Sequence, residues 1–289
     1  MVINVSPVRR VFAAGSLAFA MVYADLHVHT DTSDGQLSLE AVPQAAREAG
    51  VSVVAVTDHD RANPGLESPV VERAGVRIIH GIELRVAAPE QRVDLLGYGL
   101  DPTPELESEI DRLGADRRER GRRIRDCLEA ELGVALDVTV DEHTGRPHLA
   151  RAVLSHPDTA YDDGVSVFQD LIGRGQSCFE PRAVPSFERG VSLLKDAARF
   201  VGLAHPFRYD DPAAALELCA ELDAVERYYP YDRPTLGDKE VDTALLDATI
   251  ETHDLLATGG SDAHGAEIGA AGLDREAFGP VAAALSIEP

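Results

Sequence analysis

Short apolar runs alternate with helical stretches along most of this 289-residue chain, and this alternation limits the fold more than any other feature. The run at residues 51–57 is apolar at nearly every position, as is typical of a strand covered on both faces. Strands that alternate with helices pair in parallel, so the pattern predicts an α/β fold. Seven strands are expected, at residues 22–28, 51–57, 76–84, 92–99, 200–206, 222–229 and 254–260.

Residues 101–190 interrupt this alternation. An arginine-dense polar stretch at 101–133 predicts a pair of helices, and a stretch containing Gly and Pro follows it. We therefore expect a small helical insertion subdomain at 101–190, beside a barrel built from residues 21–100 and 191–289. For residues 1–20 we expect a disordered leader or a mis-assigned upstream start, because Met21 immediately precedes the first predicted strand. A secretory signal peptide and an ordered extension are the alternatives.

The chain is strongly acidic, since 50 Asp and Glu against 27 Lys and Arg give a formal net charge of −23 at pH 7. This charge excludes a duplex-DNA binder that relies on a broad basic face. Lys195 and Lys239 are the two lysines, a composition typical of a halophilic protein from a salt-rich cytoplasm. Without a run of 18 apolar residues, no helical membrane span is expected. The wide spacing of Cys127, Cys178 and Cys219 predicts no disulfide framework and no zinc ribbon, and favours a reducing compartment.

Histidines and carboxylates occur where the predicted strands end. His27 and His29 are two residues apart in a strand, so both imidazoles point to one face. His59 follows the buried strand 51–57, and Glu83 ends the next one. Because catalytic residues collect at the carboxyl ends of barrel strands, we expect these side chains to converge. The further members of the set are Asp34, Asp94, His205, Asp262 and His264.

Each of these signals taken alone has a structural alternative. Asp34 lies in a turn sequence, where its side chain could hydrogen-bond its own backbone. His80 is expected to be a core or surface histidine. Glu226 could orient a ligand or make a structural hydrogen bond. Histidines outside any motif are expected at the surface, namely His143, His156 and His253. Taken together, however, converging imidazoles and carboxylates would repel one another without a cation. The sequence therefore predicts a multinuclear site for Mn, Zn or Fe, and its oxygen content favours Mn.

Six short motifs carry the predicted ligands, namely DLHVHT (25–30), SDG (33–35), TDHD (57–60), GIEL (81–84), AHP (204–206) and SDAH (261–264). In this order and spacing they resemble the PHP superfamily, named for its polymerase and histidinol phosphatase members. GRPHLAR (145–151) and AHPFRY (204–209) are similar to the branch with nucleoside 3′,5′-bisphosphate phosphatases and 5′-to-3′ RNA exonucleases. The resemblance covers residues 23–264 and implies a distorted TIM-like (β/α)7 barrel of seven strands and seven helices.

The resemblance also implies two to three divalent metal ions, at three positions. The first position would be held by His27, His29, Glu83 and Asp262, with Glu83 bridging to the second. The second would add His205 and one further ligand, and the third would use Asp34, His59 and His264. That further ligand is Asp94, His148 or a water, because family members often carry His at the position of Asp94. The catalytic residues would be His59, Glu83 and Asp262.

The chemistry follows from the metals. Two cations about 3.5–4 Å apart would share a hydroxide, which attacks phosphorus while the cations polarise the phosphoryl oxygens. Arginine suits phosphate because its guanidinium donates paired hydrogen bonds, and Arg208 and Arg146 are the first candidates for this contact. The arginine-dense stretch contributes Arg117, Arg118, Arg120, Arg122 and Arg123. These arginines either cap the pocket and hold a second phosphate, or form a solvated helix face paired with neighbouring Asp and Glu.

We therefore expect a cytoplasmic, metal-dependent phosphoesterase that acts on nucleoside 3′,5′-bisphosphates or short RNA 5′ ends through a metal-bridged hydroxide. The alternatives are a histidinol-phosphate-type phosphatase, an amidohydrolase-like hydrolase and a non-catalytic metal-binding module. An amidohydrolase with a modified bridging lysine is disfavoured, because Lys195 and Lys239 lie outside the predicted strand ends. The expected partner is a small nucleotide or short RNA, with no duplex DNA and no membrane, and the sequence leaves the oligomeric state open.

Overall fold

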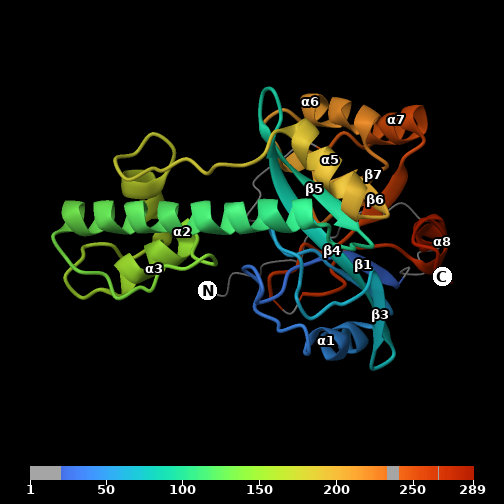
Figure 1. The fold of residues 1–289 in the computed structure, drawn as a ribbon, viewed down its shortest axis with the longest axis horizontal. Coiled ribbons are helices and arrows are strands. Elements are labelled where there is room, and N and C mark those ends of the chain that lie inside the picture. Colours follow the sequence, from blue (N-terminus) through green and yellow to red (C-terminus); the bar gives the residue numbers. More distant parts are fainter. Residues whose placement is uncertain (1–20, 233–240, 266) are drawn as a thin grey trace, which may run out of the picture.

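One curved sheet forms the centre of the computed structural model, which describes residues 21–232, 241–265 and 267–289 (Figure 1). The strands lie in the order β1-β2-β4-β5-β6-β7-β8, and β3 pairs with β4 off this path. Their bounds are β1 Ala24–Val28, β2 Val53–Val56, β3 Val70–Arg73, β4 Val76–Ala87, β5 Arg92–Tyr98, β6 Phe200–Leu203, β7 Ala224–Tyr228 and β8 Leu256–Gly259. The seven predicted strands are confirmed, and β3 is a further strand that the sequence did not predict.

The strand directions differ from the all-parallel prediction. The β1-β2-β4 and β6-β7-β8 sets are parallel, whereas β5 runs antiparallel to both of its neighbours. The cause is the short connection between β4 and β5 at residues 88–91, since a parallel crossover needs a dozen or more residues. The edge strands β1 and β8 approach each other through the isolated bridge between Val28 and Ala263, so the sheet curls into a half-barrel.

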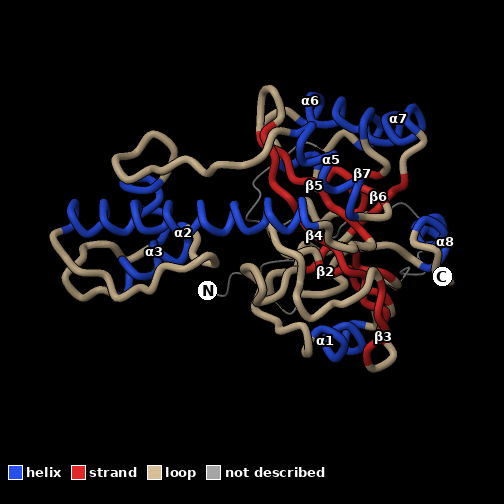
Figure 2. Tube along the Cα trace, in the orientation of Figure 1, coloured by secondary structure: helices blue, strands red, loops and turns tan. Residues whose placement is uncertain are grey.

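Helices cover the sheet from outside, as the tube drawing makes clear (Figure 2). Leu193 and Leu194 of α5 pack into the same buried cluster as Ile82 of β4, while Phe278 of α8 packs against Leu26 of β1 in another. Each such side chain stabilises the fold by about 1.5–3 kcal/mol. These covering elements are α1 Val42–Ala49, α5 Phe187–Ala197, η2 Pro206–Arg208, α6 Pro212–Glu217, η3 Leu218–Glu221, α7 Thr243–His253 and α8 Arg275–Ala284.

A long helix projects from the sheet (Figure 1), and its far half carries a separate apolar cluster. This helix, α2 Pro104–Leu132, begins at the capping side chain of Thr103 and ends at Gly133, whose φ is +68°. Ile124 and Leu128 of α2 pack there against Leu149 and Val153. The other elements of this part, which we call the arm (residues 104–182), are α3 Arg146–Ser155, α4 Gly164–Val167 and the π-helical turn η1 Phe168–Ile172.

The predicted pair of helices at 101–133 is wrong, because α2 is continuous over 29 residues. Gly121 lies inside this helix and allows close packing. A Cβ there would lie 2.7 Å from Cγ1 of Val140. The glycine therefore lets the following loop lie against the helix without interrupting it.

A disulfide joins Cys127 of α2 to Cys178, with their Cα atoms 5.5 Å apart, and buried Cys219 is a free thiol. The wide spacing, from which no disulfide framework was predicted, did not reveal this bond, and the bond counts against the inference of a reducing compartment from the cysteines. The 51-residue separation carries no local signal, and only the packing of the segment after η1 against α2 brings the two sulfurs together.

In the described part of the chain, no helix combines the length and the apolar character needed to cross a membrane. The predictions for residues 1–20 fall outside the described residues.

Candidate metal centre

Eight of the predicted ligands lie close together at one end of the sheet. His27 lies in β1 and Glu83 in β4, while the others lie in loops that directly follow strands. They form three overlapping groups in which the candidate ligand atoms lie within 4.8 Å of one another. The groups are His27, His29 and Asp262; His27, Glu83 and His205; and His29, Asp34, His59 and His264.

Glu83 is the central carboxylate of this arrangement and is fully buried. Its Oε2 lies 2.7 Å from Nδ1 of His59 and 3.4 Å from Nε2 of His29. Its Oε1 lies 3.0 Å from Nε2 of His205. Both oxygens of one carboxylate therefore face imidazoles from three different loops, which is the geometry of a bridging ligand.

Asp34 occupies the open side of the cluster, where its side chain is 43% exposed. Its carboxylate lies 3.3 Å from Nε2 of His264 and 3.9 Å from Nε2 of His59. A third cation held there would face solvent and an entering substrate, whereas the two groups around Glu83 are buried.

The loops that carry His205 and Asp262 have unusual backbone conformations. His205 has φ +29° and Asp262 has φ +49°, a left-handed region that few residues other than glycine adopt. At Gly260, a Cβ would overlap the backbone of His27, so only glycine lets this loop lie against β1. Such strain concentrates at functional sites, where the surrounding structure holds it.

The donor atoms are suited to a metal. Nε2 of His27 and both ring nitrogens of His29 are buried without a hydrogen bond, although carboxylate oxygens lie 3.2–3.6 Å from the two Nε2 atoms. Buried polar atoms ordinarily have partners, so nitrogens that converge on carboxylates without bonding to them fit a shared cation. Nitrogen and carboxylate donors without thiolate match Mn, Zn or Fe.

The electrostatics agree with this interpretation. Burial acts to raise the pKa of Glu83, but His59 and His27 hold it well below its ordinary value. Burial acts to lower the pKa of His27, but the carboxylates of Glu226, Glu83 and Asp262 raise it well above its ordinary value. The carboxylate of Glu83 and the imidazolium of His27 thus stabilise each other's charged form.

Asp94 and His148 lie outside the three groups. Asp94 Oδ1 accepts a hydrogen bond from Nε of Arg85 at 2.7 Å, and its other oxygen is 3.8 Å from Nε2 of His205. His148 Nδ1 accepts the N–H of Gly145 at 3.0 Å and so completes the N-terminus of α3. In this geometry Asp94 serves to hold a guanidinium near the cluster, a role that the sequence did not indicate.

Three buried carboxylates behind the ligands hold them in place. Glu226 lies 3.1 Å from Nδ1 of His27 and accepts the backbone N–H of His205 at 2.8 Å. Asp25 accepts hydrogen bonds from Ser261 and from the backbone of Gly269, which fixes the loop carrying two ligands. Asp58 does the same for the loop after β1, through Thr30 and Ser33. The sequence left Glu226 open and missed the other two, although both lie inside ligand motifs.

A pocket of about 380 Å³ opens beside Asp34 and His59. Its arginines come from β4, β5, α2, α3 and the end of the arm, and they are Arg85, Arg92, Arg117, Arg120, Arg146, Arg151 and Arg182. Arg117, Arg120 and Arg146 were predicted and the other four were not: Arg85, Arg92 and Arg182 lie outside any motif, and Arg151 was not singled out although it ends the motif GRPHLAR. His143, expected at the surface, is half-buried and lines this pocket.

The remaining predicted arginines differ in their surroundings. Arg118 pairs with Glu142 at 3.3 Å, and Arg122 and Arg123 pair with Glu119, so these three follow the structural alternative. Arg208 Nη1 lies 2.7 Å from Oδ2 of Asp262, at the edge of the metal cluster. It also lines a second pocket of about 590 Å³ that shares Arg92 and Arg146 with the first.

The structure disfavours the lysine-bridged amidohydrolase alternative. Lys195 is exposed on α5, on the outside of the sheet, and Lys239 lies outside the described residues.

Comparisons with known proteins agree with this geometry. A model of the PHP domain matches residues 25–178. The chain is 30% identical over 199 residues to the 3′,5′-nucleoside bisphosphate phosphatase of Chromobacterium violaceum, covering 66% of this chain and 69% of that protein. It is 29% identical over 257 residues to the 5′-3′ exoribonuclease Rnm of Escherichia coli, covering 85% and 86%.

A solved structure from Bifidobacterium adolescentis, assigned to the metal-dependent phosphoesterases, shares the fold. It has a TM-score of 0.71 over 91% of this chain and 96% of that chain, at 23% identity. The family model covers more than half of the chain and includes the motifs that hold His27, His29, His59 and Glu83. The resemblance seen in the sequence is thus confirmed, and the chain belongs to the PHP domain family.

Proposed function

We propose that this protein is a metal-dependent phosphoesterase that hydrolyses nucleoside 3′,5′-bisphosphates or short RNA 5′ ends. One observation carries the proposal: the histidine–carboxylate cluster around Glu83 opens directly into a pocket lined by seven arginines. A metal cluster alone suits many hydrolases, but a cationic pocket beside it suits a substrate with more than one phosphate. Relatives named for bisphosphate nucleotides and for RNA support the same substrate class.

The proposed ligands are taken from the three groups and assigned to ions as the family resemblance implies. His27, His29, Glu83 and Asp262 would hold one ion, and Glu83 with His205 a second. Asp34, His59 and His264 would hold a third. We propose Mn as the metal, since mixed imidazole and carboxylate donors suit it. Asp94 would contribute to the second position only after its bond to Arg85 breaks.

A divalent metal in these positions would activate water and polarise the phosphoryl oxygens. The residues of the chain have separate tasks. Glu83 and Asp262 have pKa values below their ordinary range, so they stay ionised and keep their oxygens available. Arg208 would use the donors that do not face Asp262 to orient the reacting phosphate, and the arginine pocket would hold the second phosphate.

We further propose that residues 101–190 act as an insertion subdomain of the barrel. Its own apolar cluster supports this division, and its contribution of Arg117, Arg120 and Arg146 to the pocket gives it a role in substrate binding. The acidic, lysine-poor composition supports a cytoplasm rich in salt, where the surface charge is screened and a short anionic substrate can approach.

The test is phosphate release from adenosine 3′,5′-bisphosphate at high salt with Mn²⁺, compared with the same mixture containing a chelator and with histidinol phosphate. Chelator-sensitive release from the bisphosphate alone is expected. Release from histidinol phosphate alone would support the other phosphatase class, and bound metal without any release would indicate a non-catalytic module.

Two variants test the site itself. His59→Ala and Glu83→Ala should each abolish turnover while the far-ultraviolet circular dichroism spectrum stays near that of the wild type. Glu72→Ala, an exposed carboxylate on β3, is the matched control and should keep full activity. Retained activity in both site variants would refute the assignment.

A further inference from the structure

Asp60 connects the metal cluster to the arm, although its carboxylate is absent from the candidate metal groups of the described residues. It directly follows His59, and its backbone N–H donates to the carbonyl of Glu83 at 2.8 Å. Its φ is +49°, a conformation that Asp tolerates better than most residues because its short side chain bonds locally. The side chain is 4% exposed, so its charge requires partners in the protein.

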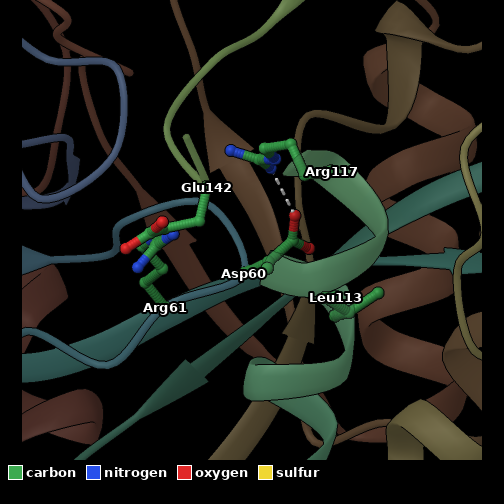
Figure 3. A pocket seen from close by; sticks show the side chains of 6 residues that line it. Asp60, Arg61, Leu113, Arg117 and Glu142 are labelled. Carbon is green, nitrogen blue, oxygen red and sulfur yellow. Dashed lines mark hydrogen bonds and ion pairs between the residues drawn. The ribbon is translucent and has the colours of Figure 1, made fainter. Parts of the chain in front are cut away.

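Those partners come from three segments. Asp60 Oδ1 accepts the backbone N–H of Arg85 at 3.1 Å. Asp60 Oδ2 accepts Nη2 of Arg117 at 2.8 Å, the bond drawn in Figure 3, and also pairs with Arg182. Arg117 lies on α2 and Arg182 at the end of the arm, so one carboxylate oxygen contacts both segments that connect the arm to the sheet.

The same three arginines line the 380 Å³ pocket. Like charges this close repel one another, and burial strengthens the repulsion because water no longer screens it. Burial already lowers the pKa of Arg182 to about 10. The Asp60 carboxylate contacts the guanidiniums of Arg117 and Arg182 and offsets their repulsion, while the guanidinium of Arg85 pairs with Asp94. Because a guanidinium carries five donors, Arg117 and Arg182 keep further N–H groups for a ligand of the pocket.

We propose that Asp60 is a positioning residue that fixes Arg117 and Arg182 of the arm for binding of the non-reacting phosphate of the substrate. The proposal deepens the proposed function and rests on it for the identity of the ligand. Asp60 acts through the arginines and not on the metals, because its carboxylate faces the arm while its backbone supports His59 and Glu83.

The experiment compares wild-type protein with Asp60→Asn, loaded with Mn²⁺ in both cases. Asn keeps the size and the tolerance of a left-handed backbone and removes the charge. Calorimetric binding of inorganic phosphate should weaken roughly tenfold, the loss expected when one charged hydrogen bond is disturbed. The KM for adenosine 3′,5′-bisphosphate should rise similarly, while kcat and bound metal stay within about twofold.

A double-mutant cycle tests the route of the effect. Arg117→Gln alone should weaken phosphate binding, and Asp60→Asn should weaken it less in that background than in the wild type, because the contact with Arg117 is already gone and only the pairing with Arg182 is left to lose. Matched controls on α2 are Asp126→Asn and Arg112→Gln, exposed residues paired with Arg125 and Glu109, and both should bind phosphate as the wild type does.

Unchanged or tighter phosphate binding by Asp60→Asn overturns the proposal, as does an additive cycle or a loss of metal. Should this variant fail to fold, Arg182→Gln measures the same interaction from the arm side, and unchanged phosphate binding there also overturns it. If the wild type binds phosphate but hydrolyses no phosphoester, the proposed function fails while the binding data still decide the role of Asp60.

Discussion

Glu226 offers the sharpest test of how the metal cluster is held, because it touches two candidate ligands without belonging to any group. In Glu226→Gln the amide oxygen can keep one contact, either with Nδ1 of His27 or with the backbone N–H of His205, now 3.1 and 2.8 Å from the carboxylate. The amide nitrogen, itself a donor, then faces the N–H of the other partner, and that second hydrogen bond is lost. Both contacts are fully buried, so a lost charged hydrogen bond costs about 1.5–3 kcal/mol.

This cost corresponds to roughly 10- to 100-fold weaker metal binding, the range found when partners of metal-bound histidines are removed. The assay is titration of chelator-treated protein with Mn²⁺, followed by calorimetry, with the exposed Glu251→Gln on α7 as the control. The number of ions bound should not change. A Kd within about twofold of the wild type would refute the reasoning, and the loss of a whole ion would instead make Glu226 a ligand.

Three further predictions concern other parts of the molecule. Arg208→Ala should raise the KM for the bisphosphate roughly tenfold, since its bond to Asp262 places it at the cluster, and an unchanged KM removes it from the site. Burial lowers the pKa of His80 from 6.5 to about 4, so between these values only the unfolded chain takes up the proton. Between pH 7 and pH 4 the free energy of unfolding, measured by urea denaturation, should therefore fall by about 3 kcal/mol more in the wild type than in His80→Leu. An equal fall in the two proteins would contradict this. Replacing Cys127 and Cys178 by Ser should lower the free energy of unfolding by about 4 kcal/mol in the chain-entropy account of a 51-residue loop, and three reactive thiols in unfolded, unreduced wild type would exclude the bond.

The ligand cluster could be predicted from the sequence because its members share a local rule. His59 and His205 each follow a short apolar run, and strand ends are visible in a sequence. The ends of neighbouring strands lie close together, so the order of strands in the sheet determines which of these side chains meet.

The arginine pocket could not be predicted in the same way. Arg85 and Arg182 are 97 positions apart and meet only because the arm returns to the sheet at α5. The reversed direction of β5 had a visible cause in its four-residue connection to β4, but its apolar run is the same as that of a parallel strand. Asp94 was predicted as a ligand from its position, and its pairing with Arg85 follows from that reversal, which sets the two side by side on adjacent strands.

The half-open sheet has a consequence for when the site can form during synthesis. His27 and His29 leave the ribosome early, whereas Asp262 and His264 follow more than 230 residues later, in the loop after the opposite edge strand. At ordinary translation rates this delay is roughly 10–50 s. No earlier stretch of the nascent chain contains the complete first group, so a growing chain cannot capture its ions in final form before its last strand arrives. Completion of the first ligand group and the meeting of the two sheet edges thus depend on the same late-synthesised segment of the chain.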